Sequence, residues 1–244
     1  MRRAVDVVRD IAPNARAEYI AALDAGDGQL DEAGVTTSLR LAHLLAQCGG
    51  ECSFRDVRES LFYTTLDNLL RIFRNMRLDP PLFPGEAEML LRQERDLGER
   101  FYGQPFQSPL YAAHRINGGV NPGNREKARR LGNDRPGDGF LFRGNGMLQT
   151  TGGKAHREIG IKCHVDFFNH PELLTAPEHA LKPVLSEWTD TGCNAFADAD
   201  DLLKISRAIN FGNPNAPGTP NGMDNRRMWL DRAKQALGIS GAVA

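Results

Sequence analysis

Residues 47–64 read QCGGECSFRDVRESLFYT, and this stretch places two glutamates around the end of a helix. Glu51 follows a pair of glycines, and Glu59 stands eight positions later. Acid–base cleavage of a glycosidic bond needs one protonated and one ionised carboxyl. The apolar run before Glu51 is expected to desolvate that carboxyl and favour its protonated form, whereas Arg55 and Arg58 would keep Glu59 ionised.

The spacing of the two glutamates constrains the helix that carries the first of them. On one straight helix they would stand about 12 Å apart along the axis, too far for the roughly 6.5–9.5 Å of an inverting pair. The helix must therefore end or bend between them. Gly49 and Gly50 are expected to end it, because glycine readily adopts the left-handed conformation past a helix C-terminus. The alternative is a pair of solvated surface glutamates.

Further blocks follow in order along the chain. Residues 137–152 read GDGFLFRGNGMLQTTG, residues 169–188 read NHPELLTAPEHALKPVLSEW, and ISRAINFGN at 205–213 precedes NGMDNR at 221–226. With LAQCGGE and ESLFYT upstream, these blocks resemble the signatures of glycoside hydrolase family 19, the chitinase and phage-lysozyme family, and look closest to its phage endolysin-like branch. The resemblance covers the chain from about Thr36 to Leu237.

The resemblance implies a role for each residue that matches the family pattern. It implies an inverting mechanism in which Glu51 is the acid, Glu59 is the base and Thr151 helps Glu59 to hold the attacking water. The residues implied to bind substrate or to lie beside the carboxylates are Gln149, Asn210, Arg226, Tyr63 and Arg143. Arg143 is also a candidate for holding the loop or a glutamate, with a solvated arginine as the alternative. For residues 143–152, a glycine-rich turn capping a helix that begins near Thr151 is as good an interpretation as a binding loop.

Three positions depart from the family pattern. Gly50 stands where a histidine is usual, Ala155 where an asparagine is usual, and Phe211 replaces the first glycine of an INGG motif. None of these changes removes a carboxylate. They leave open a second class of function, a protein that binds glycan but cleaves it weakly.

Composition excludes several other classes of protein. The 244 residues carry a net charge of −1, which argues against a nucleic-acid-binding protein. No run approaches the roughly 18 apolar residues of a membrane span. The six histidines are scattered, so neither a metal site nor a cofactor is expected. Cys48 and Cys52 could approach each other, but two small buried thiols are the favoured interpretation.

The first ten residues, MRRAVDVVRD, are basic but lack the apolar core of a signal peptide. We therefore expect a protein made in the cytoplasm that acts on the cell wall in the periplasm after release by a holin or a secretion system.

Periodicity predicts a mainly α-helical, lysozyme-like fold of two lobes with a substrate cleft between them. We expect a single catalytic domain over 1–244, with a larger lobe of 1–64 and 112–244, a smaller lobe of 65–111, and no wall-binding module. The expected helices span residues 2–11, 15–23, 36–47, 66–76, 86–101, 125–131, 177–191, 198–209 and 224–237.

The expected function is that of an endolysin-type peptidoglycan hydrolase, a monomer that cleaves β-1,4 bonds of the glycan strand. Few cysteines and the absence of an aromatic-rich chitin-binding module favour this substrate. The alternative enzyme is a chitinase acting on chitin-like oligosaccharides with the same two glutamates.

Overall fold

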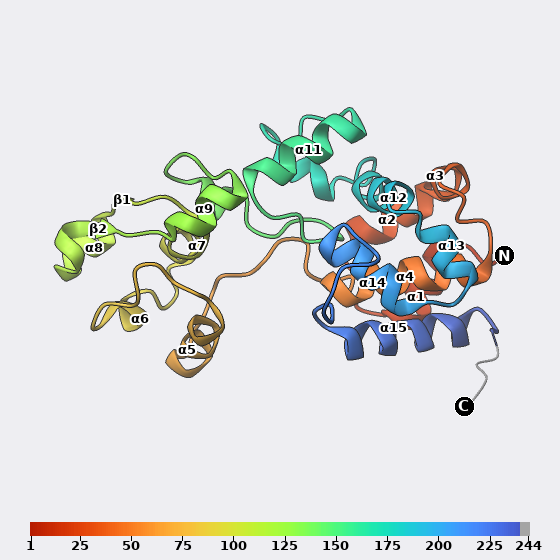
Figure 1. The fold of residues 1–244 in the computed structure, drawn as a ribbon, viewed down its shortest axis with the longest axis horizontal. Coiled ribbons are helices and arrows are strands. Elements are labelled where there is room, and N and C mark those ends of the chain that lie inside the picture. Colours follow the sequence, from red (N-terminus) through yellow and green to blue (C-terminus); the bar gives the residue numbers. More distant parts are fainter. Residues whose placement is uncertain (240–244) are drawn as a thin grey trace.

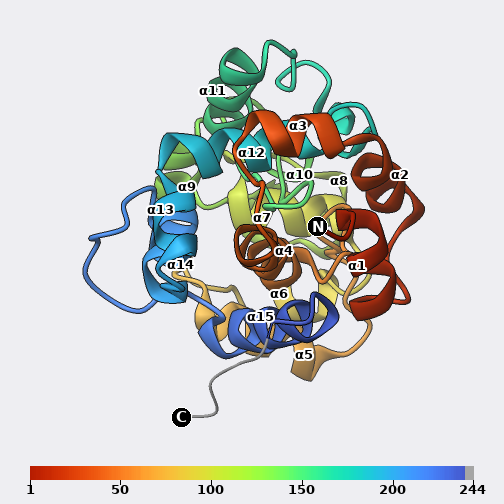
Figure 2. The ribbon, with the colours of Figure 1, turned by 90° about the vertical axis from the view of Figure 1, so that its right-hand side faces the viewer.

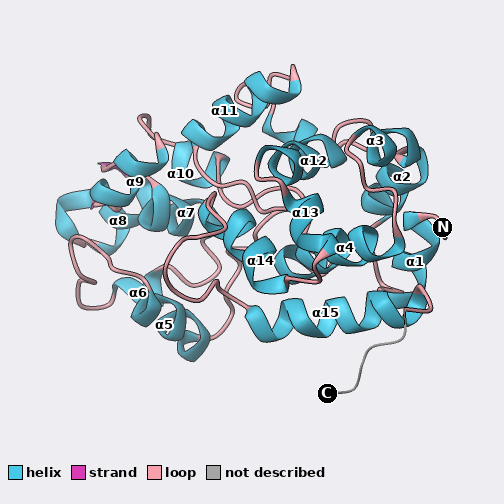
Figure 3. Cartoon of the chain, turned by 45° about the vertical axis from the view of Figure 1, so that its right-hand side comes forward, coloured by secondary structure: helices cyan, strands magenta, loops and turns pink. Residues whose placement is uncertain are grey.

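A computed structural model describes residues 1–239 and shows a mainly α-helical protein, as predicted (Figure 3). Residues 240–244, the end of the predicted domain, lie outside the described residues. Within the described chain, the one sheet is a two-stranded antiparallel ladder, in which Phe106 pairs with Asn121.

The helices of the larger lobe lie together at one end of the molecule, where both ends of the described chain also lie (Figure 1). They come from the first 52 residues and from the chain after residue 152. Their bounds are α1 Ala4–Ile11, α2 Ala17–Ala25, α3 Asp27–Glu32, α4 Ser38–Cys52, α11 Gly153–Cys163, η2 Pro171–Thr175, α12 Leu181–Asp190, α13 Cys193–Asp198, α14 Leu202–Phe211 and α15 Met223–Ala236.

Helix α4 forms the centre of this lobe, ringed by α1, α13, α14 and α15 (Figure 2). It begins where the Thr37 hydroxyl accepts a hydrogen bond from the Arg40 backbone N–H at 3.2 Å. The sequence predicted one apolar stripe, but nearly every residue from Leu41 to Gly49 is buried because neighbouring helices cover all sides. The helix therefore fixes the position of whatever follows its last turn.

The smaller lobe lies at the other end of the molecule (Figure 1). Its elements are α5 Leu66–Asn75, α6 Glu86–Met89, α7 Glu94–Tyr102, β1 Phe106–Gln107, α8 Pro109–His114, η1 Asn117–Gly119, β2 Val120–Asn121 and α9 Arg125–Leu131, followed by α10 Asp138–Leu141, which packs on α7. Its hydrophobic cluster extends from Leu61 to Leu131 and Phe140. Residues on both sides of the predicted 65–111 segment thus pack into its core.

The helix predicted over residues 86–101 is two helices, α6 and α7. Arg92 interrupts them with a left-handed φ of 63°, and its backbone N–H donates to the Tyr63 carbonyl at 2.9 Å. This tertiary contact takes the place of a continued helical hydrogen bond. By contrast, the short helix predicted over residues 125–131 has those bounds in the structure.

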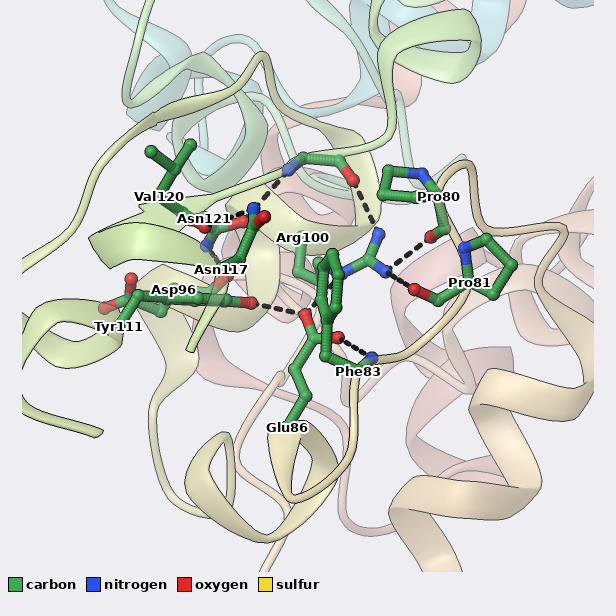
Figure 4. Close-up of polar contacts among 11 residues, drawn as sticks. Pro80, Pro81, Phe83, Glu86, Asp96, Arg100, Tyr111, Asn117, Val120 and Asn121 are labelled. Atoms are coloured by element: carbon green, nitrogen blue, oxygen red, sulfur yellow. Dashed lines mark hydrogen bonds and ion pairs between the residues drawn. The ribbon is translucent and has the colours of Figure 1, made fainter. Parts of the chain in front are cut away.

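A fully buried ion pair cross-links the smaller lobe (Figure 4). Arg100 Nε donates to Glu86 Oε1 at 2.6 Å, and the Tyr111 hydroxyl donates to the same oxygen at 2.5 Å. The remaining guanidinium nitrogens of Arg100 donate to the carbonyls of Gly123 and Pro80, each at 2.6 Å. Both charged side chains are 0% exposed, so the pair is stable only because its polar atoms are satisfied.

Candidate active site

The last turn of α4 carries Glu51, as the spacing of the glutamates required: the helix ends at Cys52, between the two carboxylates. Two predictions about this turn are wrong. Gly49 and Gly50 lie inside the helix, and the left-handed residue that caps it is Ser53, with φ 52°. The second wrong prediction is an apolar environment for the Glu51 carboxylate, because the guanidinium of Arg226 forms an ion pair with it.

The two glycines allow α15 to approach α4 closely. A Cβ at Gly49 would lie 2.5 Å from the Trp229 ring, and a Cβ at Gly50 would lie 2.6 Å from Cγ of Arg226. Side chains at these positions would therefore separate the helices. The stem of Arg226 crosses the space that a side chain at position 50 would fill.

Arg226 is 1% exposed and is held by several partners. One terminal nitrogen bonds Glu51, and the other donates to the side-chain oxygen of Gln47, one helical turn before Glu51. Its Nε donates to the Asn221 carbonyl at 3.2 Å, and Gln47 in turn donates to the Ser206 hydroxyl at 3.4 Å. Buried hydrogen bonds thus fix the guanidinium that faces the Glu51 carboxylate.

Glu59 lies beyond the helix, in an extended segment that leads to the smaller lobe. Its carboxylate accepts a hydrogen bond from the Tyr102 hydroxyl at 2.9 Å and another from the Gly144 N–H at 3.2 Å. The backbone N–H of Glu59 donates to the Gly144 carbonyl at 2.8 Å. The loop after α10 and the end of α7 therefore hold the second glutamate.

The arginines predicted to keep Glu59 ionised do not bond its carboxylate. Arg55 is exposed, and the Arg58 guanidinium donates to the Leu141 carbonyl at 2.9 Å. Arg143 donates to the backbone carbonyl of Glu59 at 2.9 Å and stacks 3.9 Å from the centre of the Phe140 ring. Arg143 thus holds the loop to the Glu59 segment, one of the two roles predicted for it.

Further titratable groups surround Glu59. The Lys127 ammonium lies 4.4 Å above the Tyr102 ring, and burial lowers the pKa of this lysine while the Glu59 charge opposes that shift. Burial, followed by the charge of Glu59, raises the pKa of Tyr102. The same two causes raise the pKa of Tyr63. Both phenols are therefore neutral, and Tyr102 donates its hydrogen bond to the carboxylate.

The loop of residues 143–152 brings Gln149 and Thr151 to this region. Gln149 donates to the carbonyls of Asp56 and Gly146, each at 2.9 Å, and its side-chain oxygen would lie 2.7 Å from a Cβ at Gly144. The Thr151 hydroxyl donates to the Gln149 carbonyl at 2.8 Å. Gln149 and Glu59 therefore flank Gly144, and the oxygen lone pairs of Thr151 are left to accept a further hydrogen bond.

A hollow of about 800 Å³ lies between α11, α12 and the end of α14. Thr151 and Asn210 both line it, and Ala155 lines it from the first turns of α11. The side-chain oxygen of Asn210 accepts from the Asn221 N–H at 3.4 Å. Glu51 and Glu59 are not among its lining residues, which come from the larger lobe and from the loop of residues 143–152.

Three further features of residues 1–239 concern metal ions, membranes and thiols. No group of three histidine, cysteine, aspartate or glutamate side chains there could hold a metal ion, and no helix there is long and apolar enough to cross a membrane. Cys48, Cys52, Cys163 and Cys193 are free thiols, which confirms the interpretation of the first two.

The similarity of the chain to known proteins agrees with the resemblance of its sequence blocks. No family model matches the sequence. A glycosyl hydrolase family 19 domain-containing protein of Haemophilus influenzae is 27% identical over 202 residues, which covers 81% of this chain and 80% of that protein. The crystal structure of chitinase C from Streptomyces griseus has a TM-score of 0.56 and 15% identity, covering 98% of this chain and 79% of that chain. Both likenesses support the resemblance of the chain to glycoside hydrolase family 19.

The chain is a glycoside hydrolase with a chitinase-like helical fold. At 15% identity, the likeness to the chitinase concerns the fold alone.

Three contacts of this candidate site were not predicted from the sequence. Gln47 precedes Glu51 by one helical turn, a spacing that could have indicated a shared partner. Tyr102 lies 43 positions from Glu59 in the sequence, and Lys127 lies 68 positions from it. No local sequence pattern connects either residue with Glu59.

Proposed function

We propose that this glycoside hydrolase cleaves the β-1,4 bonds of the peptidoglycan glycan strand with inversion, using Glu51 as general acid and Glu59 as general base. Its place of action is the cell wall. The observation that carries the proposal is that the two glutamates are held by different lobes: Glu51 by Arg226 of α15, and Glu59 by Tyr102 of α7. A glycan strand that passes between the lobes would meet one carboxyl from each side.

Arg226 acts on Glu51 as the proton leaves, because an ion pair is made with the carboxylate form. A general acid becomes a carboxylate as it gives its proton to the leaving oxygen, and a guanidinium fixed by Gln47 stabilises the negative charge that develops. Because Arg226 is held in place before the reaction, little reorganisation is required during the proton transfer.

Tyr102 and the Gly144 N–H suit the role of Glu59. Each occupies one carboxylate oxygen, so the carboxylate is oriented while lone pairs remain for a water. Thr151 supplies a hydroxyl oxygen that can accept a second hydrogen bond of that water. Inversion follows when this water attacks the face of the sugar opposite the leaving group.

The test uses purified protein on two polymers with the same type of linkage. Peptidoglycan sacculi are expected to release soluble muropeptides, whereas chitin oligomers remain largely uncut. Mass spectrometry of the reducing ends identifies the bond, and proton NMR of the first product gives its anomeric configuration.

The matched control is Glu51→Gln, which keeps the side-chain volume and cannot donate the proton. Its rate is expected to fall by roughly 10²–10⁴-fold or more while the melting temperature stays near that of the parent. Efficient cleavage of chitin with intact sacculi would make the enzyme a chitinase. Binding to sacculi without turnover would make it a glycan-binding protein.

A further inference from the structure

The hollow that Thr151 and Asn210 line also has charged residues of α11 and α12 in its lining. We call the part lined by Thr151 and Asn210 the inner hollow, and the part lined by Lys162, Glu158 and Glu187 the outer hollow. Ile161, at 75% exposed, also lines it. The volume of about 800 Å³ lies in the upper part of the roughly 300–1,000 Å³ range of ligand sites.

A polysaccharide of N-acetylated sugars has no charged groups that could pair with the charged side chains of the outer hollow. N-acetylated sugars offer hydroxyls, amides and apolar ring faces, which neutral side chains such as those of Gln149, Thr151 and Asn210 recognise. A lysine and two glutamates instead suit a ligand that carries ions of both signs. In peptidoglycan, such ions belong to the short peptide on every second sugar, which has several carboxylates and, where it contains a diamino acid, an ammonium group.

We infer that the outer hollow between α11 and α12 binds the peptide stem of peptidoglycan, with Lys162 receiving a carboxylate and Glu187 or Glu158 facing the ammonium group. The inference rests on the proposed function and adds that the enzyme recognises the stem as well as the strand.

The state of Lys162 fits this role. Its ammonium group lies 2.6 Å from Asp190 and 3.4 Å from Glu187, and all three side chains are between about one third and one half exposed. The hydrogen bond that Lys162 donates to Asp190 raises the pKa of Lys162 above its ordinary value, so the lysine is charged at neutral pH. Exposed ion pairs are weak and screened, so a ligand carboxylate can replace an intramolecular partner.

Ala155 leaves space at the passage from the inner to the outer hollow. It lines the hollow on α11, two turns before Lys162, and its side chain is a single methyl group. A strand whose sugar contacts Thr151 and Asn210 could therefore extend its stem along α11 without meeting a large side chain at this point.

The experiment compares two forms of one substrate: intact glycan strands with stems, and the same strands after an amidase has removed the stems. The parent is expected to show a higher kcat/KM on stem-bearing strands. Lys162→Met should lower the ratio of the two kcat/KM values by about three- to tenfold, the effect of one exposed charge-assisted contact. Glu187→Gln, a milder change, should lower it in the same direction.

Lys204→Met is the matched control. Lys204 lies on α14, is 45% exposed in its side chain, pairs with Asp201, and is not among the residues that line the hollow. Its ratio should equal that of the parent. Calorimetry measures binding directly. The Glu51→Gln protein should bind a soluble stem-bearing muropeptide more tightly than the peptide-free disaccharide. Adding Lys162→Met to the Glu51→Gln protein should remove this difference in affinity.

The outcomes distinguish a failure of the stem site from a failure of the proposed function. Equal kcat/KM on stem-bearing and stripped strands would overturn the stem site and leave the proposed function standing. A ratio that falls in Lys204→Met as much as in Lys162→Met would also overturn it. If the parent cuts neither form and degrades chitin, the proposed function fails and the stem site fails with it.

Discussion

At the scale of single residues, Tyr102 connects the smaller lobe to the candidate base. Its hydroxyl donates to Glu59 at 2.9 Å, while its ring packs edge-to-face on Phe101 with centres 5.9 Å apart and lies under the Lys127 ammonium. The ring contacts do not depend on the hydroxyl. The hydroxyl can therefore be removed without emptying the core.

Tyr102→Phe is expected to lower kcat about tenfold or more, because a hydrogen bond to a charged group contributes roughly 1.5–3 kcal/mol. KM should change little, since the hydroxyl orients Glu59 and does not bind the sugar. Initial rates over a range of peptidoglycan concentrations separate the two constants, and the melting temperature checks the fold. A kcat within twofold of the parent would show that Gly144 alone orients the carboxylate.

The sequence pointed to some residues of this site and not to others, for physical reasons. Glu51, Glu59 and Arg226 belong to blocks that resemble the family, so they could be named in advance. Tyr102 is held at Glu59 by the packing of the smaller lobe, which no local pattern encodes. The surrounding of Glu51 was predicted from its neighbours along the chain, whereas its decisive neighbour, Arg226, comes from 175 positions away.

At the scale of elements, the contact of α4 with α15 depends on glycine. Most helices of the larger lobe could be located from apolar periodicity, but the end of α4 could not. The usual meaning of a glycine pair is a helix stop, whereas Gly49 and Gly50 meet Trp229 and Arg226 of the opposing helix. A single segment of sequence does not show which of its residues pack closely against another helix.

Two glycine substitutions should therefore have different effects. Gly49→Ala is expected to lower the free energy of unfolding by about 1–3 kcal/mol, because its Cβ would overlap the Trp229 ring. Gly50→Ala should chiefly lower activity, because the Arg226 stem must move and the guanidinium leaves Glu51. Urea unfolding and turnover of sacculi measure the two effects.

Gly28→Ala is the control for both substitutions. Gly28 lies in α3, and a Cβ there would meet nothing within 4 Å. Alanine should be neutral or slightly stabilising there. If Gly50→Ala has parental turnover, the path of Arg226 across position 50 does not matter for catalysis.

His156 ties α11 to the loop that carries Thr151. Its Nδ1 donates to the Gly152 carbonyl at 2.9 Å, and its ring lies 5.0 Å from that of Phe142. The side chain is 0% exposed, and burial lowers the pKa of His156 to about 4. The folded protein therefore keeps this imidazole neutral at a pH where the unfolded chain protonates it.

The sign of the pH dependence follows from this difference. Below pH 6.5 the unfolded chain binds a proton on His156 that the folded protein excludes. The contribution of His156 to the free energy of unfolding is therefore complete above that pH and is lost as the pH falls toward 4. The loss should amount to about 3 kcal/mol. Urea midpoints of the parent and of His156→Gln between pH 7 and 4 test this, because the variant should lack that part of the slope. Identical slopes would contradict it.

At the scale of the whole molecule, the lobes have separate cores, and each holds one glutamate. The two hydrophobic clusters, which begin at Ala4 and at Leu61, share no buried residue. The mainly helical character could be predicted from periodicity. The chain segments that pack into the smaller lobe could not, because Leu131 and Phe140 reach its core from beyond the predicted insertion.

The buried Glu86–Arg100 pair links the stability of the smaller lobe to the site, since α7 carries both Arg100 and Tyr102 (Figure 4). Arg100→Met should cost about 3–5 kcal/mol, because it leaves the Glu86 charge buried without its partner. Arg16→Met is the comparison: the exposed Arg16–Glu18 pair should contribute less than about 1 kcal/mol.

Hydrogen exchange distinguishes unfolding of one lobe from unfolding of the whole protein. In Arg100→Met, the backbone amides of α7 and α8 should exchange faster, because their protection depends on the cluster around Glu86. Amides of α4 and α15, which pack in the other core, should keep most of their protection. Turnover of peptidoglycan by Arg100→Met should fall as the amides of α7 lose protection, since Tyr102 loses its fixed position next to Glu59. If the amides of α4 lose protection by the same factor as those of α7, the lobes unfold as one unit, and the base could not be disabled independently of the acid.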